Sequence, residues 1–159
     1  MTSAREFTLI HTLTGSPAEA FAAWTEPALL TWFLNPETTP LDEPITVDLR
    51  VGGAFRLRMV HDGLEYVTGG IYREIVPSER IVFEWGAVDG WPKLDPEKPD
   101  DAPVVTLTFR DNGDGTTEQT LHSSLPESMP DDRAAEWLAT GMRDGWGMTV
   151  GRLASRLAV

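Results

Sequence analysis

The chain of 159 residues carries a net charge of −12, from 25 acidic and 13 basic side chains, which is opposite to the basic surface that nucleic acids and anionic membranes attract. It contains no cysteine, which excludes disulfides and thiol chemistry, and no signal peptide or apolar run near the roughly 20 residues of a membrane span. With 41% hydrophobic residues and six tryptophans, the chain is predicted to form one packed cytoplasmic domain over residues 1–159.

The first elements are predicted to be a strand followed by two short helices. Residues 7–13 are rich in apolar and β-branched side chains, which is typical of a strand. Ser16 and Glu19 have the spacing of a capping box, with a proline between them at the first helical position, so a short helix is expected to begin there. Pro27 is predicted to start a second short helix.

From residue 46 onward the hydrophobic period changes to two, which indicates antiparallel strands. Strands are expected at residues 46–50, 55–59, 66–76, 81–85, 105–109 and 116–124. Gly69 and Gly70 are expected to interrupt the third of these strands, and residues 86–103, with four prolines, to form an exposed loop. Strands grouped together with helices at both ends predict an α+β fold.

The last stretch, residues 131–157, is predicted to be one amphipathic helix of roughly seven turns. At 3.6 residues per turn it carries an apolar stripe, made of Ala135, Leu138, Met142, Trp146, Leu153 and Leu157. A broad apolar surface must cover this stripe. We therefore expect a curved antiparallel sheet of about six to seven strands wrapped around the long C-terminal helix.

Four glycines lie inside this predicted helix, and each lowers helix stability by about 1 kcal/mol relative to alanine. They are Gly141, Gly145, Gly147 and Gly151. Gly141 and Gly145 are four residues apart and therefore share one flank of the helix. Two interpretations of this pair stay open, namely close approach of the helix backbone to a strand and room for a bound molecule.

Residue types that carry most enzyme and metal chemistry are sparse. His11, His61 and His122 lack the spacing of metal ligands, although His11 and His122 could meet across the sheet. The sequence has neither a glycine-rich phosphate loop nor a nucleophile elbow. No catalytic residue, metal site or cofactor is therefore predicted.

Arg56, Arg58 and Arg73 occupy predicted strand positions among acidic residues. Cross-strand ion pairs on the outer sheet face are the expected arrangement, and an anion-binding group at a pocket mouth is the alternative. Glu74 and Glu84 could act as general acids only if they pointed into a cavity, whereas the alternation of their strands places them on the outer face.

Short motifs are spread in order along nearly the whole chain: residues 16–21, Trp32-Phe33, residues 51–55, 70–77 and 79–85, Gly145-Trp146, Leu153 and Leu157. Together they resemble the Hsp90 ATPase activator homologue 1-like family of the START-like, or Bet v 1-like (SRPBCC), superfamily. The resemblance implies a helix-grip fold with a cavity between the sheet and the C-terminal helix. It also implies that relatives bind lipids, hormones or polyketides, or act as cyclases or hydratases.

The eukaryotic activators that name this family carry an additional N-terminal domain that contacts the chaperone. The present sequence begins directly at its first predicted strand, so we expect it to lack such a segment. Contact with a chaperone is therefore kept as an alternative to ligand binding and not as the leading hypothesis.

A set of aromatic and large apolar residues is predicted to converge between sheet and helix, either as plain core or as a ligand pocket of a few hundred Å3. The set consists of Trp32, Phe55, Leu57, Met59, Tyr72, Phe83, Trp85, Leu107, Trp137 and Met142. The leading hypothesis is a cofactor-free monomer or homodimer that binds an apolar or aromatic small molecule there. The alternatives are a modulator of a chaperone or other protein partner, and an enzyme of the cyclase or hydratase type.

Overall fold

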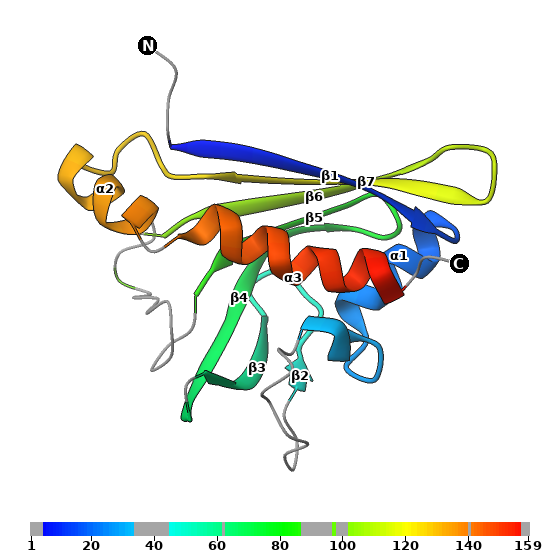
Figure 1. Cartoon of the computed structure of the whole chain (residues 1–159), viewed down its shortest axis with the longest axis horizontal. Helices are drawn as coiled ribbons and strands as arrows, with labels where there is room; N and C mark the ends of the chain where they lie inside the picture. Colours follow the sequence, from blue (N-terminus) through cyan, green and yellow to red (C-terminus); the bar gives the residue numbers. More distant parts are fainter. Residues whose placement is uncertain are drawn as a thin grey trace.

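The computed structural model describes residues 5–33, 45–61, 63–86, 97, 102–139 and 141–156. In chain order the elements are β1 (Glu6–Thr14), α1 (Pro17–Thr25), η1 (Leu30–Phe33), β2 (Ile45–Val47), β3 (Ala54–His61), β4 (Leu64–Val76), β5 (Arg80–Trp85), β6 (Val104–Asp111), β7 (Thr116–Ser124), α2 (Asp131–Ala139) and α3 (Met142–Arg156). After β1 and the first helices, six consecutive strands lead to the C-terminal helices, and this order confirms the predicted α+β class and helix-grip arrangement (Figure 1).

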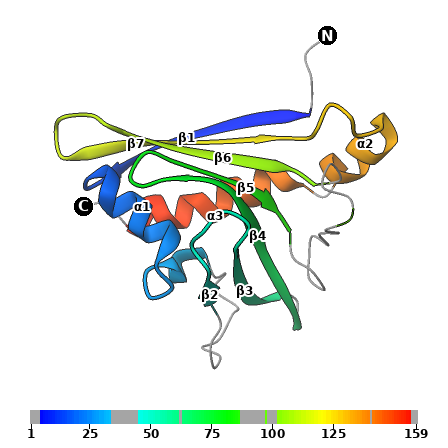
Figure 2. The ribbon, with the colours of Figure 1, turned by 180° about the vertical axis from the view of Figure 1, so that it is seen from behind.

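The seven strands form one antiparallel sheet in the order β1-β7-β6-β5-β4-β3-β2. The strands from β2 to β7 pair in the order of the sequence, and β1 pairs with β7 at the other edge of the sheet. In both views the sheet bends so that β3 and β4 turn away from the plane of β1 and β7, and α3 lies in the bend (Figures 1 and 2). The predicted curved sheet around the C-terminal helix is confirmed.

The bend coincides with irregularities in β4. The pairing of β4 with β5 shifts register between Tyr72 and Glu74, which is a β-bulge that strengthens local twist. The predicted interruption of this strand is wrong, because Gly69 and Gly70 both pair in the ladder. Their role is close approach, since a Cβ on Gly69 would lie 1.9 Å from the carbonyl oxygen of Phe55.

For the segment after β1, the predicted order of elements is correct, but not every predicted element is. Ser16 accepts a hydrogen bond from the backbone N–H of Glu19, whose carboxylate accepts one from the N–H of Ser16, so the predicted capping box of α1 is confirmed. The predicted second helix is instead the single 3₁₀ turn η1, which starts at Leu30 because Pro27–Leu29 form a turn. The next predicted strand ends early, at Val47, because the chain turns back at Gly52, where φ is +86°.

The prediction of one continuous C-terminal helix is wrong. The helix α2 ends at Ala139, and Gly141 adopts the left-handed conformation with φ +76° before α3 begins. Its N–H donates to the carbonyl of Leu138 at 3.3 Å, and its own carbonyl accepts from Gly145 at 2.9 Å as the new helix starts. Glycine past a helix end is favoured because it has no Cβ to resist this conformation. Gly141 therefore ends one helix and opens the next.

The break also changes which side of the first segment is buried. Ala135 is exposed, whereas Ala134 and Trp137 are buried, because α2 is not in phase with the stripe of α3. In α3 the predicted stripe is confirmed for Met142, Trp146 and Leu153, which the structure buries together with Val150. Leu157 lies outside the described residues.

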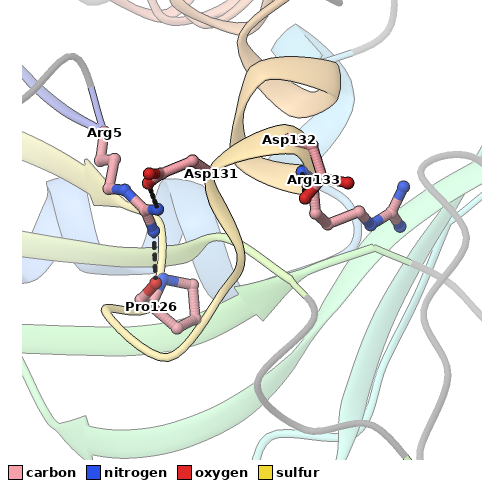
Figure 3. Close-up of polar contacts among 5 residues, drawn as sticks. All are labelled: Arg5, Pro126, Asp131, Asp132 and Arg133. Atoms are coloured by element: carbon pink, nitrogen blue, oxygen red, sulfur yellow. Dashed lines mark hydrogen bonds and ion pairs between the residues drawn. The ribbon is translucent and has the colours of Figure 1, made fainter.

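Arg5, just before β1, anchors the start of α2. Its Nη2 atom lies 2.5 Å from the Oδ1 atom of Asp131, and its Nη1 donates to the carbonyl of Pro126 at 3.0 Å. Figure 3 shows Arg5 pointing at both groups, while Arg133 projects from the other side of the helix. The contact fixes the connection from β7 to α2 against the first strand.

Aromatic rings fill the space between the sheet and α3. Trp146 is 3% exposed, and its ring lies 5.4 Å from that of Trp85, 5.7 Å from Phe33, 6.2 Å from Phe83 and 6.5 Å from Trp24. Edge-on and tilted ring pairs at such distances add to the stabilisation from buried area. Within the described ranges, no helix combines the length and apolar character needed to cross a bilayer.

Candidate functional site

A cavity of about 150 Å3 remains between α3 and the bent part of the sheet. It is lined by residues from η1, β3, β4, β5 and the start of α3: Phe33, Met59, Tyr66, Thr68, Trp85, Gly141, Met142, Gly145, Trp146 and Thr149. Gly141 and Gly145 are exposed and Tyr66 and Thr149 half-buried, so the cavity opens to solvent on that side. A mostly apolar hollow of this volume has room for a molecule of the size of benzene.

The glycine pair of the C-terminal region borders this hollow. A Cβ built on Gly141 or Gly145 would meet no atom of another residue within 4 Å. The interpretation as close approach of the helix to a strand is therefore wrong for both positions. The space beside them is open, and a larger side chain at Gly145 would extend into it.

Three of the ten residues predicted for the pocket line the cavity, namely Met59, Trp85 and Met142. The other seven are buried in the core beside it: Trp32, Phe55, Leu57, Tyr72, Phe83, Leu107 and Trp137. Phe55, for example, packs its ring 4.9 Å from Phe83 and 5.5 Å from Tyr72. The space is smaller than the expected few hundred Å3 because these side chains occupy the deeper part of the fold.

Several lining residues were not among the predicted set. Tyr66 and Thr68 precede the predicted Tyr72 on β4 at alternate positions, so the period of two could have placed them on the same inner face. Thr149 lies one turn beyond Trp146 and Gly145 on α3, at helical spacing. Phe33 lies on the short 3₁₀ turn η1 and is buried there.

The polar groups of the cavity are mainly hydrogen-bond donors. The indole N–H of Trp85 donates to the hydroxyl of Thr68 at 3.2 Å, and the hydroxyl of Tyr66 donates to the sulfur of Met59 at 3.7 Å. The buried Nε1 of Trp146 finds no acceptor among the described residues. Burial raises the pKa of Tyr66, which the nearby Arg152 partly offsets, so its hydroxyl stays protonated and able to donate at neutral pH.

None of the ten lining residues is Asp, Glu or His. The cavity as described therefore lends no support to the cyclase or hydratase interpretation, which requires a titratable acid or imidazole in the hollow. Glu74 and Glu84 do not line it either. They form ion pairs with Arg80 and Arg73, respectively.

The other sequence-predicted groups lie away from the cavity. In the pairing of β1 with β7, His122 lies opposite Thr8 and His11 lies opposite Gln119. The two histidines are therefore not cross-strand partners, which the sequence had left open. Arg58 lies 3.8 Å from Glu65, which together with the pair of Arg73 fits the expected cross-strand arrangement. Within the described part of the chain, no three Asp, Glu, His or Cys residues are grouped as metal ligands.

Comparison with known families and structures supports the fold on independent grounds. The family model described as "Activator of Hsp90 ATPase homolog 1-like protein" matches residues 14–158. No protein with a curated description matches the chain.

Many solved structures are similar. A Nitrosomonas europaea protein is 22% identical with a TM-score of 0.72, covering 98% of this chain and 95% of its own. A Rhizobium leguminosarum protein described as putative and uncharacterised is 25% identical with a TM-score of 0.65, covering 98% and 96%. An HSP90 activator from Plasmodium falciparum is 22% identical with a TM-score of 0.57, covering 87% and 88%.

Proposed function

Because the chain belongs to the activator of Hsp90 ATPase homologue 1-like family, whose fold here leaves a hollow under its C-terminal helix, we propose that it binds a small apolar or aromatic molecule in that hollow without a cofactor. The single observation that carries this proposal is the cavity of about 150 Å3 lined by Met59, Trp85, Met142 and Trp146. An apolar pocket with a few placed polar groups is the usual form of a small-molecule site. The open side at Gly145 provides an entrance.

Binding to the native state alone raises the free energy of unfolding, by about 2.7 kcal/mol when the ligand is present at 100 times its Kd. For a domain of this size each kcal/mol corresponds to about 2–4 °C in Tm. A panel of small probes that carry one benzene ring, such as toluene, benzyl alcohol and phenylacetamide, should therefore contain members that raise Tm by several degrees. If every probe at saturating concentration leaves Tm unchanged, the cavity does not bind such molecules.

A pair of matched variants separates cavity binding from surface adsorption. Gly145→Leu places a side chain into the hollow and should abolish the shift in Tm. Gly147→Leu makes the same change two residues along the same helix, at a position that does not line the cavity and where added atoms also meet open space. It should therefore retain the shift, and equal loss in both variants would argue against the cavity as the site.

A second candidate function is modulation of a protein partner, specifically an Hsp90-type chaperone. It is favoured by the similarity to the Plasmodium falciparum protein described as an HSP90 activator. Here the purified chain should raise the rate of ATP hydrolysis by purified Hsp90 and co-migrate with it. Gly145→Leu should leave that effect unchanged, whereas ligand binding would be lost, so one variant distinguishes the two functions.

A further inference from the structure

One arginine of α3 lies at the edge of the cavity. Arg152 donates from Nη2 to the backbone oxygen of Phe33 at 2.8 Å and from Nε to that of Trp32 at 3.1 Å. Its Nη2 atom is also 3.5 Å from the hydroxyl oxygen of Thr149. Arg152 is not itself one of the ten lining residues, but it contacts two of them, Phe33 and Thr149, and its charge acts on a third, Tyr66, so the guanidinium lies directly behind the lining.

Arg152 has different partners from the ion-paired arginines of the sheet. Arg58, Arg73 and Arg80 each lie within ion-pair distance of a glutamate. Arg152 is half-buried and, within the described ranges, contacts only carbonyl and hydroxyl oxygens, with no carboxylate and no acceptor for Nη1. A partly desolvated cation without a counter-ion favours a nearby anion more strongly than a fully solvated one does.

The remaining polar groups of the cavity point to the same chemistry. The indole N–H of Trp146, which is 3% exposed, has no acceptor among the described residues, and the Tyr66 hydroxyl is a further donor that lines the cavity. A buried donor without an acceptor lowers stability, and a ligand with acceptor atoms restores the missing hydrogen bond. These donors and Arg152 together select for a ligand that carries oxygen acceptors.

We propose that the ligand is a small aromatic carboxylate whose ring occupies the cavity and whose carboxylate accepts hydrogen bonds from the guanidinium of Arg152. This inference rests on the proposed function and adds the chemical class of the ligand. Arginine suits a carboxylate because its planar fork can donate two parallel hydrogen bonds.

Arg152 also has a structural role, because its bonds to Trp32 and Phe33 satisfy carbonyls at the end of η1. That role uses Nε and part of Nη2 and leaves Nη1 for a ligand. The net charge of −12 disfavours anions at long range, but at physiological salt interactions beyond about 8 Å are largely screened. The distant acidic side chains therefore oppose binding of a carboxylate beside Arg152 only weakly.

The test compares phenylacetate with phenylacetamide, its uncharged counterpart of similar shape, by calorimetric titration. We expect the wild-type protein to bind phenylacetate at least ten times more tightly than phenylacetamide. Arg152→Gln should reduce this preference to under threefold and leave the Kd of phenylacetamide nearly unchanged. Arg143→Gln removes the same charge from an exposed position nine residues earlier, on the opposite side of α3, and should preserve the preference.

An NMR titration of the wild-type protein keeps the inference testable if Arg152→Gln does not fold. In the 15N-labelled protein, the Nε–Hε signal of Arg152, assigned by its loss in Arg152→Lys, should shift with phenylacetate and stay in place with phenylacetamide. Equal affinity for the two compounds, or a preference that survives in Arg152→Gln, overturns the inference and leaves the proposed function standing. If toluene, phenylacetamide and phenylacetate all fail to bind, the proposed function fails, and the inference falls with it.

Discussion

Trp24 donates its indole N–H to the side-chain oxygen of Gln119 at 2.8 Å, and the two side chains are 3% and 0% exposed. The bond joins α1 to β7 inside an otherwise apolar core. A primary amide placed on the inner face of a strand is costly unless it is hydrogen-bonded. The indole of Trp24 satisfies the amide oxygen of Gln119, whereas the amide nitrogen finds no partner among the described residues.

We predict that Trp24→Phe lowers the free energy of unfolding by about 1–3 kcal/mol, because it leaves the buried oxygen of Gln119 without its donor. Gln119→Leu should also destabilise, because it leaves the indole N–H unpaired. The double variant should lose less than the sum of the two single variants, because both polar groups are then gone. Urea unfolding of the four proteins measures the cycle, and strictly additive losses would show that the two groups are not coupled.

Gly141 and Gly145 should respond to alanine in opposite directions. Gly141 has φ +76°, a conformation that costs a residue with a Cβ about 1–2 kcal/mol, so Gly141→Ala should destabilise by that amount. Gly145 is helical and a Cβ there meets open space, so Gly145→Ala should stabilise by about 0.5–1 kcal/mol. Thermal unfolding measures both, and changes of the same sign would show that the break between α2 and α3 is not where it is described.

Stability at alkaline pH should depend on Tyr72. Burial, and secondarily the nearby charge of Asp48, raise the pKa of its hydroxyl above the ordinary value of 10.0. Above pH 10 the unfolded chain loses this proton while the native protein retains it, so the free energy of unfolding falls as pH rises. Below pH 10 the hydroxyl is protonated in both the native and the unfolded state, so its titration takes nothing from stability there.

Tyr72→Phe removes this titration and should therefore show a smaller loss of stability between pH 8 and pH 11. At pH 7 the variant should be neutral or slightly stabilising, because the buried hydroxyl finds no partner among the described residues. Urea midpoints at the three pH values test the prediction. A wild-type protein whose midpoint does not change up to pH 11 would contradict it.

The capping box gives a prediction for the start of α1. Ser16→Ala removes the acceptor of the Glu19 N–H and should cost about 1 kcal/mol, whereas Ser16→Gly should recover all but a few tenths. Both variants can be compared with the wild type by chemical unfolding. Equal losses for alanine and glycine would indicate that the hydroxyl, and not the backbone geometry of the cap, dominates this helix end.

Local rules of the sequence were sufficient wherever neighbouring residues decide the structure. The capping box at Ser16, the alternation in β3 and the spacing of Met142, Trp146 and Leu153 are set within one or two turns or pleats, and each is found in the structure. The strands of the sheet likewise follow from the alternation of apolar and polar residues, because alternate side chains point to the same face and the apolar face is buried.

The helix break was not predictable in the same way. Four glycines have equal intrinsic cost in a helix, but only Gly141 turns left-handed and ends α2. The choice depends on how Trp137 on one side and Met142 on the other are buried against the sheet. Periodicity along the chain contains no such information.

By itself, the sequence determined the fold class, the inner faces of the strands and the family, because periodicity, capping and motif order are properties of neighbouring residues. Only the tertiary structure decided which inner-face residues border the cavity and that Arg152 lies at its edge. The physical reason is that a cavity is a gap between side chains from five elements. Its position depends on the bend of the sheet and on the seating of α3, and both of these are set by the packing of residues distant in the chain.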